Sequence, residues 1–354
     1  MGKTRKSGEC LKALVKLALP VFKRTEKENP RTGRGDKPQV PDWLMGVLIM
    51  IVVLKKKKRK SAQYRYLLEN RQQITEWTGE KRFPGRSTYF RRYRRARTFY
   101  RAAIRLQGVQ AIAEGIADPH DVAIDKSLLD GLGEPWHKRD QRAGKKPAGI
   151  DTEATWSYSE HHGWVYGYSY EIVVSATPGI VVFPLLASVD VASTSEMKTC
   201  PEKLAQLPEG VVNASLDSGY DGNALAEQME YEADGKKNGR HYLCPENPRH
   251  KRTKTKRCGA DKHRAEARRR RAERRKYLES KKGKRIYARR KKTVEPFNQW
   301  LKSLFELDGG TWHRGLENNQ TQILAAIFAY QLLVRYNHKH GKENGQVCSI
   351  LDKL

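Results

Sequence analysis

The sequence predicts an α/β fold preceded by a helical region. Short runs of β-branched and aromatic residues alternate with helical patterns from about residue 121 to residue 243, as in α/β proteins. Within that stretch, Trp164–Ala176 and Ile180–Leu186 flank a Pro178–Gly179 turn, which predicts a β-hairpin. The first 120 residues contain only helical patterns, so we expect the sheet to begin after them.

The N-terminal third divides into an arm and a helical domain. Residues 1–40 are polar and basic and contain Pro30 and Gly33, which favours a flexible arm. Helices are expected over 43–54, over 61–79 with Gly79 as the stop, and over 88–116. These three helices predict a small helical domain with a basic face over residues 41–118, which becomes a candidate DNA-binding domain once the charge of the chain is considered.

The remaining elements predict the main domain over residues 119–338, followed by a tail over 339–354. Its short strands are expected at 122–124, 211–216 and 240–243, and its helices at 195–207, 223–231, 262–280, 295–306 and 316–336. The segment of about 244–286 is so basic that it is interpreted as a mostly helical insertion in this domain.

Charge indicates the class of partner. The 354 residues carry a formal net charge of +29, and Lys and Arg concentrate in two segments, 81–105 and 249–292, whereas 106–217 is acidic. Such an excess favours nucleic acid over an anionic membrane. Five scattered cysteines exclude a disulfide scaffold, and no apolar run reaches the 18 residues of a membrane span, so we expect a soluble cytoplasmic protein. The DNA contacts are expected at Arg91, Arg92, Arg94 and Arg95 and at Arg268, Arg269, Arg270 and Arg271.

Three carboxylates are the candidate site. Asp125 and Asp217 each follow a short β-branched run, in the contexts AIDKSLLDG and SLDSGYDG, where the strand ends of an α/β sheet form sites. Glu295 would lie on the polar face of a helix that also presents Asn298 and Lys302. Each Asp could instead be a turn former or a helix cap, and the helix an ordinary amphipathic one.

The motifs AID, LDSGYDG and YARRKKTVEPFNQWLK resemble the three acidic blocks of DDE transposases from prokaryotic insertion sequences. Glu295 and Lys302 match the spacing of the branch with a tyrosine-arginine-glutamate-lysine signature. Tyr287 and Arg290 each stand one residue further from the Glu than in that branch. The blocks RFPGRSTYFRR and TWHRGLENNQTQILAAIFAYQLL also look like parts of the family, so the resemblance covers roughly residues 42–338.

The resemblance implies an RNase H-like catalytic core in which Asp125, Asp217 and Glu295 hold Mg²⁺ or Mn²⁺. It implies DNA cleavage and strand transfer at element ends with terminal inverted repeats, a target DNA, and a homodimer in the nucleoid. Lys302, Arg290 and Tyr287 would contact DNA. Two alternatives stay open: a nuclease of the same fold that does not join strands, and a non-enzymatic nucleic-acid-binding protein.

Weaker patterns favour structural interpretations. Asp221 is expected to cap the helix after it, and Asp190 to form a turn. Cys244, Cys258 and His263 could ligate zinc, but their spacing lacks the close cysteine pair that is typical of structural zinc sites.

Overall fold

The computed structural model describes residues 2–30, 39–160, 163–248 and 262–354. Its centre is a mixed six-stranded sheet in the order β2-β3-β1-β5-β6, with β4 also paired to β3. Strand β1 runs antiparallel to β3 and parallel to β5, and β5 runs parallel to β6. The strands are β1 (Asp121–Asp130), β2 (Thr155–Ser159), β3 (Gly163–Ser175), β4 (Pro184–Val191), β5 (Asn213–Ser215) and β6 (His241–Leu243).

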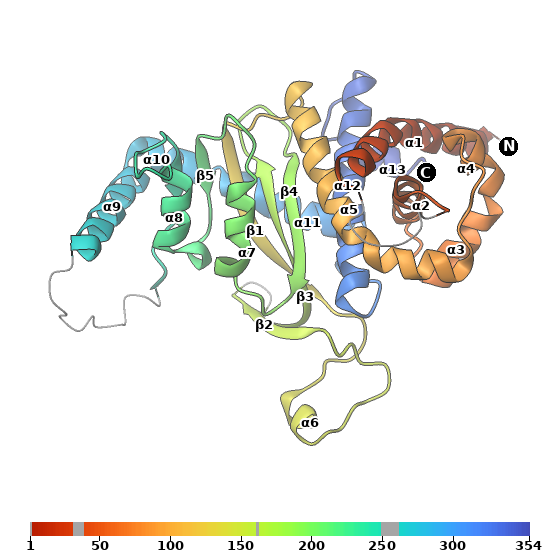
Figure 1. Cartoon of the computed structure of the whole chain (residues 1–354), viewed down its shortest axis with the longest axis horizontal. Helices are drawn as coiled ribbons and strands as arrows, with labels where there is room; N and C mark the ends of the chain where they lie inside the picture. Colours follow the sequence, from red (N-terminus) through yellow and green to blue (C-terminus); the bar gives the residue numbers. More distant parts are fainter. Residues whose placement is uncertain (1, 31–38, 161–162, 249–261) are drawn as a thin grey trace.

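Helices from both ends of the chain pack beside the sheet. Figure 1 shows α5 and α12 between the sheet and the remaining N-terminal helices, and both contact β4. Helix α2 is apolar on all sides because it lies inside this bundle, buried from Leu44 to Leu54. The helices of this part are α1 (Gly2–Glu28), α2 (Asp42–Leu54), α3 (Lys60–Glu69), α4 (Arg71–Thr78), α5 (Arg86–Ala113), α12 (Leu316–Lys339) and α13 (Cys348–Leu351).

The two basic helices lie at the far edge of the sheet, together with the acidic helix α8. Figure 1 shows α8, α9 and α10 beyond β5, on the side opposite to the N-terminal bundle. The helices outside the bundle are α6 (Lys138–Arg142), α7 (Glu196–Ala205), α8 (Asn223–Glu230), α9 (Lys262–Glu279), α10 (Lys281–Tyr287) and α11 (Val294–Leu304), with 3-10 turns at Ser218–Tyr220 and Arg290–Lys292. Residues 249–261 of the expected insertion lie outside the described residues.

The prediction of a flexible N-terminal arm is wrong for most of its length. Residues 2–28 form α1, and one face of this helix, including Leu14, Val15 and Phe22, is fully buried. The apolar stripe in Leu11–Phe22 therefore belongs to the core, and the basic residues around it cover the outer face of the helix.

Other expected elements form with changed limits. The expected helix over 61–79 is two helices that meet at Asn70, and Gly79 ends the second in the left-handed conformation, as predicted. The strand expected to end at Asp125 continues to Asp130, because KSLLD pairs with β3. No helix among the described residues is long and apolar enough to cross a membrane.

Candidate active site

Asp125 lies in β1, which is a central strand of the sheet between β3 and β5. Its side chain is buried, and Oδ1 accepts a hydrogen bond from Arg290 Nη2 at 2.5 Å. Oδ2 accepts one from Asn298 Nδ2 at 2.8 Å. Burial raises the pKa of Asp125 to about 6, against the opposing effect of the Arg290 charge. Both oxygens of the carboxylate are therefore held by side-chain donors.

Asp217 follows β5, the parallel neighbour of β1. Pairing of Ala123 with Ser215 brings the two acidic residues to the same part of the sheet. Asp217 caps the 3-10 turn after it, with Oδ1 accepting from Gly219 N at 2.8 Å, and Oδ2 lies 3.9 Å from Arg290 Nη2. Burial raises the pKa of Asp217 above its ordinary value.

Glu295 comes from a helix that packs across β1. It lies in the first turn of α11, where Pro296 is also accepted because its missing N–H has no partner in that turn. Glu295 Oε1 accepts a hydrogen bond from Arg290 Nη1 at 3.0 Å. Lys302, two turns later, is buried and donates from Nζ to the Leu128 carbonyl at 2.8 Å, which ties α11 to β1.

Arg290 joins the three carboxylates. Its guanidinium is buried and makes an ion pair with each of Asp125, Asp217 and Glu295. Burial raises the pKa of the Tyr287 hydroxyl to about 12, and the charges of Arg290, Asp217 and Glu295 also act on it. The fold thus gathers Asp125, Asp217 and Glu295, from elements far apart in the chain, around Arg290, which is paired with protein acids in place of the DNA contact expected from the sequence.

Two neighbours of the site were not predicted as functional. Asn298 was recognised only as part of a polar helix face, yet it holds the Asp125 carboxylate from the side opposite to Arg290. Glu196, at the start of α7, raises the pKa of Asp217 by charge repulsion and pairs with Lys126 at 3.3 Å. The sequence gave no signal of this pair, because Lys126 and Glu196 lie 70 residues apart in the chain.

The donor set suits a hard divalent ion. All of its atoms are oxygens, as Mg²⁺ and Mn²⁺ prefer, and the carboxylates already surround one positive charge. Asn298 Oδ1 is a further buried oxygen, with no hydrogen-bond partner among the described residues. Within the described ranges, no three His, Cys, Asp or Glu side chains are grouped closely enough to hold a metal ion as they stand.

The zinc interpretation has no support in the described residues. Cys244 Sγ lies 2.9 Å from the Asp217 carbonyl oxygen, and burial raises the pKa of its thiol. Cys258 and the side chain of His263 lie outside the described residues.

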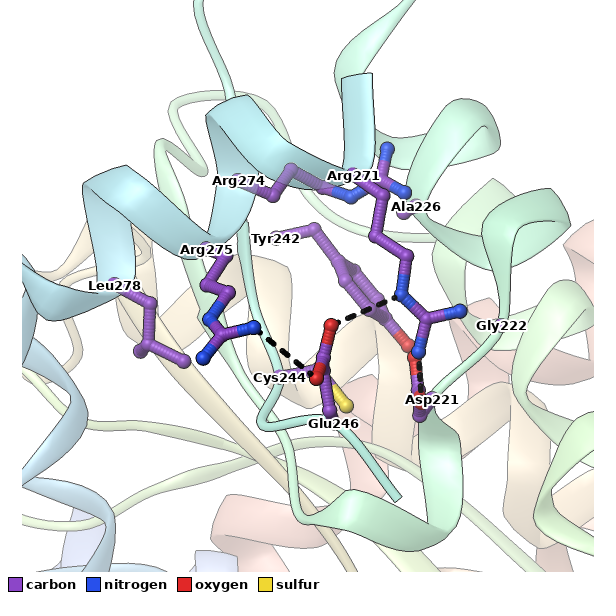
Figure 2. Close-up of a pocket in the computed structure, with 10 residues that line it drawn as sticks. All are labelled: Asp221, Gly222, Ala226, Tyr242, Cys244, Glu246, Arg271, Arg274, Arg275 and Leu278. Atoms are coloured by element: carbon purple, nitrogen blue, oxygen red, sulfur yellow. Dashed lines mark hydrogen bonds and ion pairs between the residues drawn. The ribbon is translucent and has the colours of Figure 1, made fainter. Parts of the chain in front are cut away.

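The basic helix α9 is partly neutralised by the protein itself. Figure 2 shows Arg271 between Asp221 and Glu246, with Nη2 2.6 Å from Asp221 Oδ2 and Nε 3.4 Å from Glu246 Oε1. Asp221 also accepts a hydrogen bond from the Asn247 amide, so its role differs from the expected helix cap. Arg270 pairs with Glu266 and Glu227. Arg268 and Arg269 are exposed, so half of the predicted cluster faces solvent.

The N-terminal arginines also divide into two sets. Arg91, Arg94 and Arg95 are exposed on α5. Arg92 is buried, with Nη2 2.5 Å from Asp42 Oδ1 and Nη1 donating to the Val40 carbonyl. Arg92 is therefore a structural residue in this fold, and its prediction as a DNA contact is corrected.

Comparison with known proteins identifies the family. A family model described as "Transposase DDE domain" matches residues 115–332. No curated protein matches the chain. Among solved structures, the chain is similar to a piggyBac transposase in a cryo-EM synaptic complex with hairpin DNA, at 10% identity and a TM-score of 0.44, over 97% of this chain and 78% of that one. Because the matched segment exceeds half of the chain and includes Asp125, Asp217 and Glu295, the protein belongs to the transposase DDE domain family.

Proposed function

We propose that the chain is a DNA transposase that cuts and joins DNA strands, with Asp125, Asp217 and Glu295 as its catalytic acids. One observation carries the proposal: all three acids form ion pairs with a single guanidinium, although the first and the last of them are 170 residues apart in the chain. Acids can also be buried in ion pairs that only stabilise a fold. Here, however, burial keeps the pKa values of Asp125 and Asp217 raised although Arg290 acts to lower them, and perturbed pKa values are common at functional sites.

An RNase H-like core is the fold we propose for the catalytic part. The order β4-β3-β1-β5-β6 supports it, with β1, β5 and β6 parallel and β3 antiparallel to β1. In this arrangement the first acid comes from the central strand and the second from its parallel neighbour.

Mg²⁺ or Mn²⁺ is the proposed cofactor. Held by Asp125, Asp217 and Glu295, such ions would activate the attacking oxygen and stabilise the leaving oxygen of a phosphoryl transfer. Asn298 orients the Asp125 carboxylate through its Nδ2 hydrogen bond. Lys302 holds α11, and with it Glu295, against β1, which is a positioning role in place of the DNA contact expected from the sequence.

Element ends with inverted repeats and a target duplex are the proposed DNA partners, bound by a homodimer in the cytoplasm or nucleoid of a prokaryotic cell. The exposed Arg91, Arg94 and Arg95 on α5 and Arg268 on α9 supply positive charge for phosphates, together with Arg269, which is exposed and lies 3.9 Å from Glu273. The division into a DNA-binding region over 41–118 and a catalytic region over 119–338 stays a prediction.

The test is cleavage of element-end DNA by matched variants. Asp125→Asn, Asp217→Asn and Glu295→Gln should each abolish Mg²⁺-dependent cleavage while DNA binding and the melting temperature are retained. Asp221→Asn is the control, because Asp221 lies four residues after Asp217 and pairs with Arg271 instead of Arg290. Cleavage by any of the three variants at the wild-type rate would remove that acid from the proposal.

Strand joining separates the proposal from its two alternatives. Purified protein given a cleaved element end and a target plasmid should produce joined molecules. Cleavage without joining would indicate a nuclease of the same fold. Metal-independent binding without nicking would indicate a non-enzymatic DNA-binding protein.

A further inference from the structure

An exposed group of aromatic side chains lies where β2 pairs with β3. Tyr158 and Trp164 are 53% and 68% exposed, and they are directly paired across the two strands. Trp156 pairs with Tyr166 two residues along, so all four rings lie on one face of the sheet. Tyr158 and Trp164 have ring centroids 5.5 Å apart, and Trp156 and Trp164 have theirs 6.4 Å apart. We call Trp156, Tyr158 and Trp164 the aromatic patch.

Two rings of the patch, Tyr158 and Trp164, lie outside the hydrophobic core of the protein. The ring of Trp164 contacts Trp156 and Tyr158 but leaves most of its surface in water, although burying such a ring would stabilise the fold. Strand β2 pairs with β3 alone, so the patch occupies an edge of the sheet. Exposed aromatic surface at an edge indicates a binding surface.

A basic loop is fastened beside the patch. His137 stacks on Trp156 at 5.6 Å, and Trp156 Nε1 donates to the Trp136 carbonyl at 3.1 Å. Trp136 Nε1 in turn donates to the Lys145 carbonyl at 2.9 Å, which closes the loop that contains α6. Figure 1 shows this loop projecting from the end of the sheet, away from the helices.

The loop carries an excess of positive charge, since residues 136–146 hold five Lys or Arg and one acid, Asp140. Within the described part of the chain, its five basic side chains are exposed and form no ion pair: Lys138, Arg139, Arg142, Lys145 and Lys146. The arginines of α9 behave differently, because Arg270 and Arg271 are paired with acids of the protein. The ligand of the patch should therefore be anionic as well as aromatic.

We propose that the aromatic patch and the α6 loop bind an unpaired stretch of a DNA strand, with bases stacked on Trp164 and Tyr158 and phosphates near the loop cations. Base stacking requires bases that are not already stacked in a duplex, and the combination of aromatic faces with basic side chains is typical of single-strand binding. A protein partner could also contact the aromatic rings. It would not explain why five unpaired basic side chains lie beside them.

Strand β3 connects the patch to the candidate active site. Its residue Ile172 is the partner of Asp125, and Trp164 lies eight residues before it, which is about 26 Å along a strand. A strand end that is processed at the site could extend to the patch. The role of the patch in holding a processed strand end rests on the proposed function. Binding of a single strand to the patch does not require catalysis.

The experiment measures the affinity of the full chain for a labelled oligothymidine and for a duplex of equal length by fluorescence anisotropy. Trp164→Ala should weaken single-strand binding at least about fivefold and leave duplex binding unchanged. Trp164→Phe should restore most of the loss, since a ring face remains. Trp300→Ala is the control: Trp300 is 46% exposed, on a face of α11 different from those of Glu295 and Asn298.

Charge is tested separately. Replacing Lys145 and Lys146 with Gln should reduce the magnitude of the salt slope on the single strand by up to about 1.4, at about 0.7 per lost phosphate contact. Equal losses of Trp164→Ala on both DNAs, or no loss on either, would overturn the proposal. So would an unchanged single-strand affinity with an altered oligomeric state in sedimentation, which would assign the patch to a second copy of the chain.

Failure of this inference is distinguishable from failure of the proposed function. A chain that binds single strands through Trp164 but whose Asp125→Asn variant still cuts DNA would keep the patch and lose the catalytic assignment. The opposite pair of results would keep the catalytic acids and lose the patch. Thermal melting of each variant shows that the fold is intact.

Discussion

Arg290 is a positive charge placed where a metal ion is expected. Its removal should therefore change both the stability of the fold and its response to a divalent metal. Without it, the buried Asp125 carboxylate keeps only one side-chain hydrogen bond among the described residues, from Asn298, so Arg290→Gln should lower the free energy of unfolding by about 3 kcal/mol in chelator. Added Mn²⁺ should restore more stability to the variant than it adds to the wild type, because ion and guanidinium compete for the same oxygens. Denaturant unfolding with and without Mn²⁺ measures both effects.

Arg289→Gln is the matched control for this prediction. Arg289 pairs with Asp121, so its loss also breaks an ion pair at a buried acid, but one outside the three carboxylates. Its stability should fall without any added response to Mn²⁺. A variant of Arg290 that responds to Mn²⁺ no more than the wild type would mean that arginine and metal do not share the site.

His313 predicts how the fold responds to acid. Burial lowers the pKa of His313 from 6.5 to about 3, and the ring lies 3.1 Å from the Tyr93 hydroxyl. Below pH 6.5, His313 is therefore protonated in the unfolded chain but not in the folded one. The free energy of unfolding falls as the pH falls from 6.5 toward 3. The loss should approach about 1.4 kcal/mol per pH unit. His313→Gln should show a shallower acid slope in urea unfolding at pH 4 to 7, and an unchanged slope would contradict the assignment.

Helix α9 has arginines that face solvent and arginines that pair with acids of the protein. Replacing each set separately distinguishes DNA binding by the helix from its packing against the rest of the chain. Arg268 and Arg269 face solvent, so replacing both with Gln should reduce the salt slope on duplex DNA by up to about 1.8 with little change in melting temperature. Replacing Arg270 and Arg271 with Gln instead breaks pairs with Glu266, Glu227, Asp221 and Glu246, and should mainly lower the melting temperature. Equal salt slopes for the two variants would show that α9 leaves these acids when DNA binds.

The sequence predicts most elements of the sheet and helices, and the exceptions have physical reasons. Helix α1 was missed because its basic residues suggested solvation, whereas a helix can carry them on one face and bury Phe22 on the other. Strand β2 was missed because TWSYS is only five residues long, and its pairing with β3 is not visible in the local pattern. The end of β1 was misplaced because local pattern does not reveal which residues a neighbouring strand will pair.

The candidate site was predictable in its acids and less so in its geometry. Strand and turn context pointed to Asp125 and Asp217, and helix spacing to Glu295. The ion pairs that place Arg290 among them depend on the packing of α11 across β1, which no local pattern contains. For the same reason, Lys302 and Arg92 were predicted to contact DNA although the fold buries both.

At the scale of the whole molecule, one hydrophobic core joins the N-terminal helices to the sheet. It includes Phe22 of α1, Leu48 of α2, Tyr170 of β3 and Phe328 of α12. We therefore expect a single cooperative unfolding transition, and Phe22→Ala should destabilise the whole chain by about 3–5 kcal/mol. Calorimetry tests this, with Val109→Ala as the control because Val109 is 49% exposed. Two separate transitions would mean that the helical and catalytic regions unfold independently.

The ring of Phe22 stacks on that of Phe328 at 4.5 Å between centroids, so a helix made early in synthesis is completed by one made late. A ribosome adds about 5–20 residues per second, and α1 therefore leaves it roughly 15–60 s before its partner exists. During that interval the apolar face of α1 has to be shielded by other means, such as a chaperone or a temporary pairing with α2. A transcript cut short before α12 would yield a product with that face still bare, which makes it a ready target for aggregation or proteolysis.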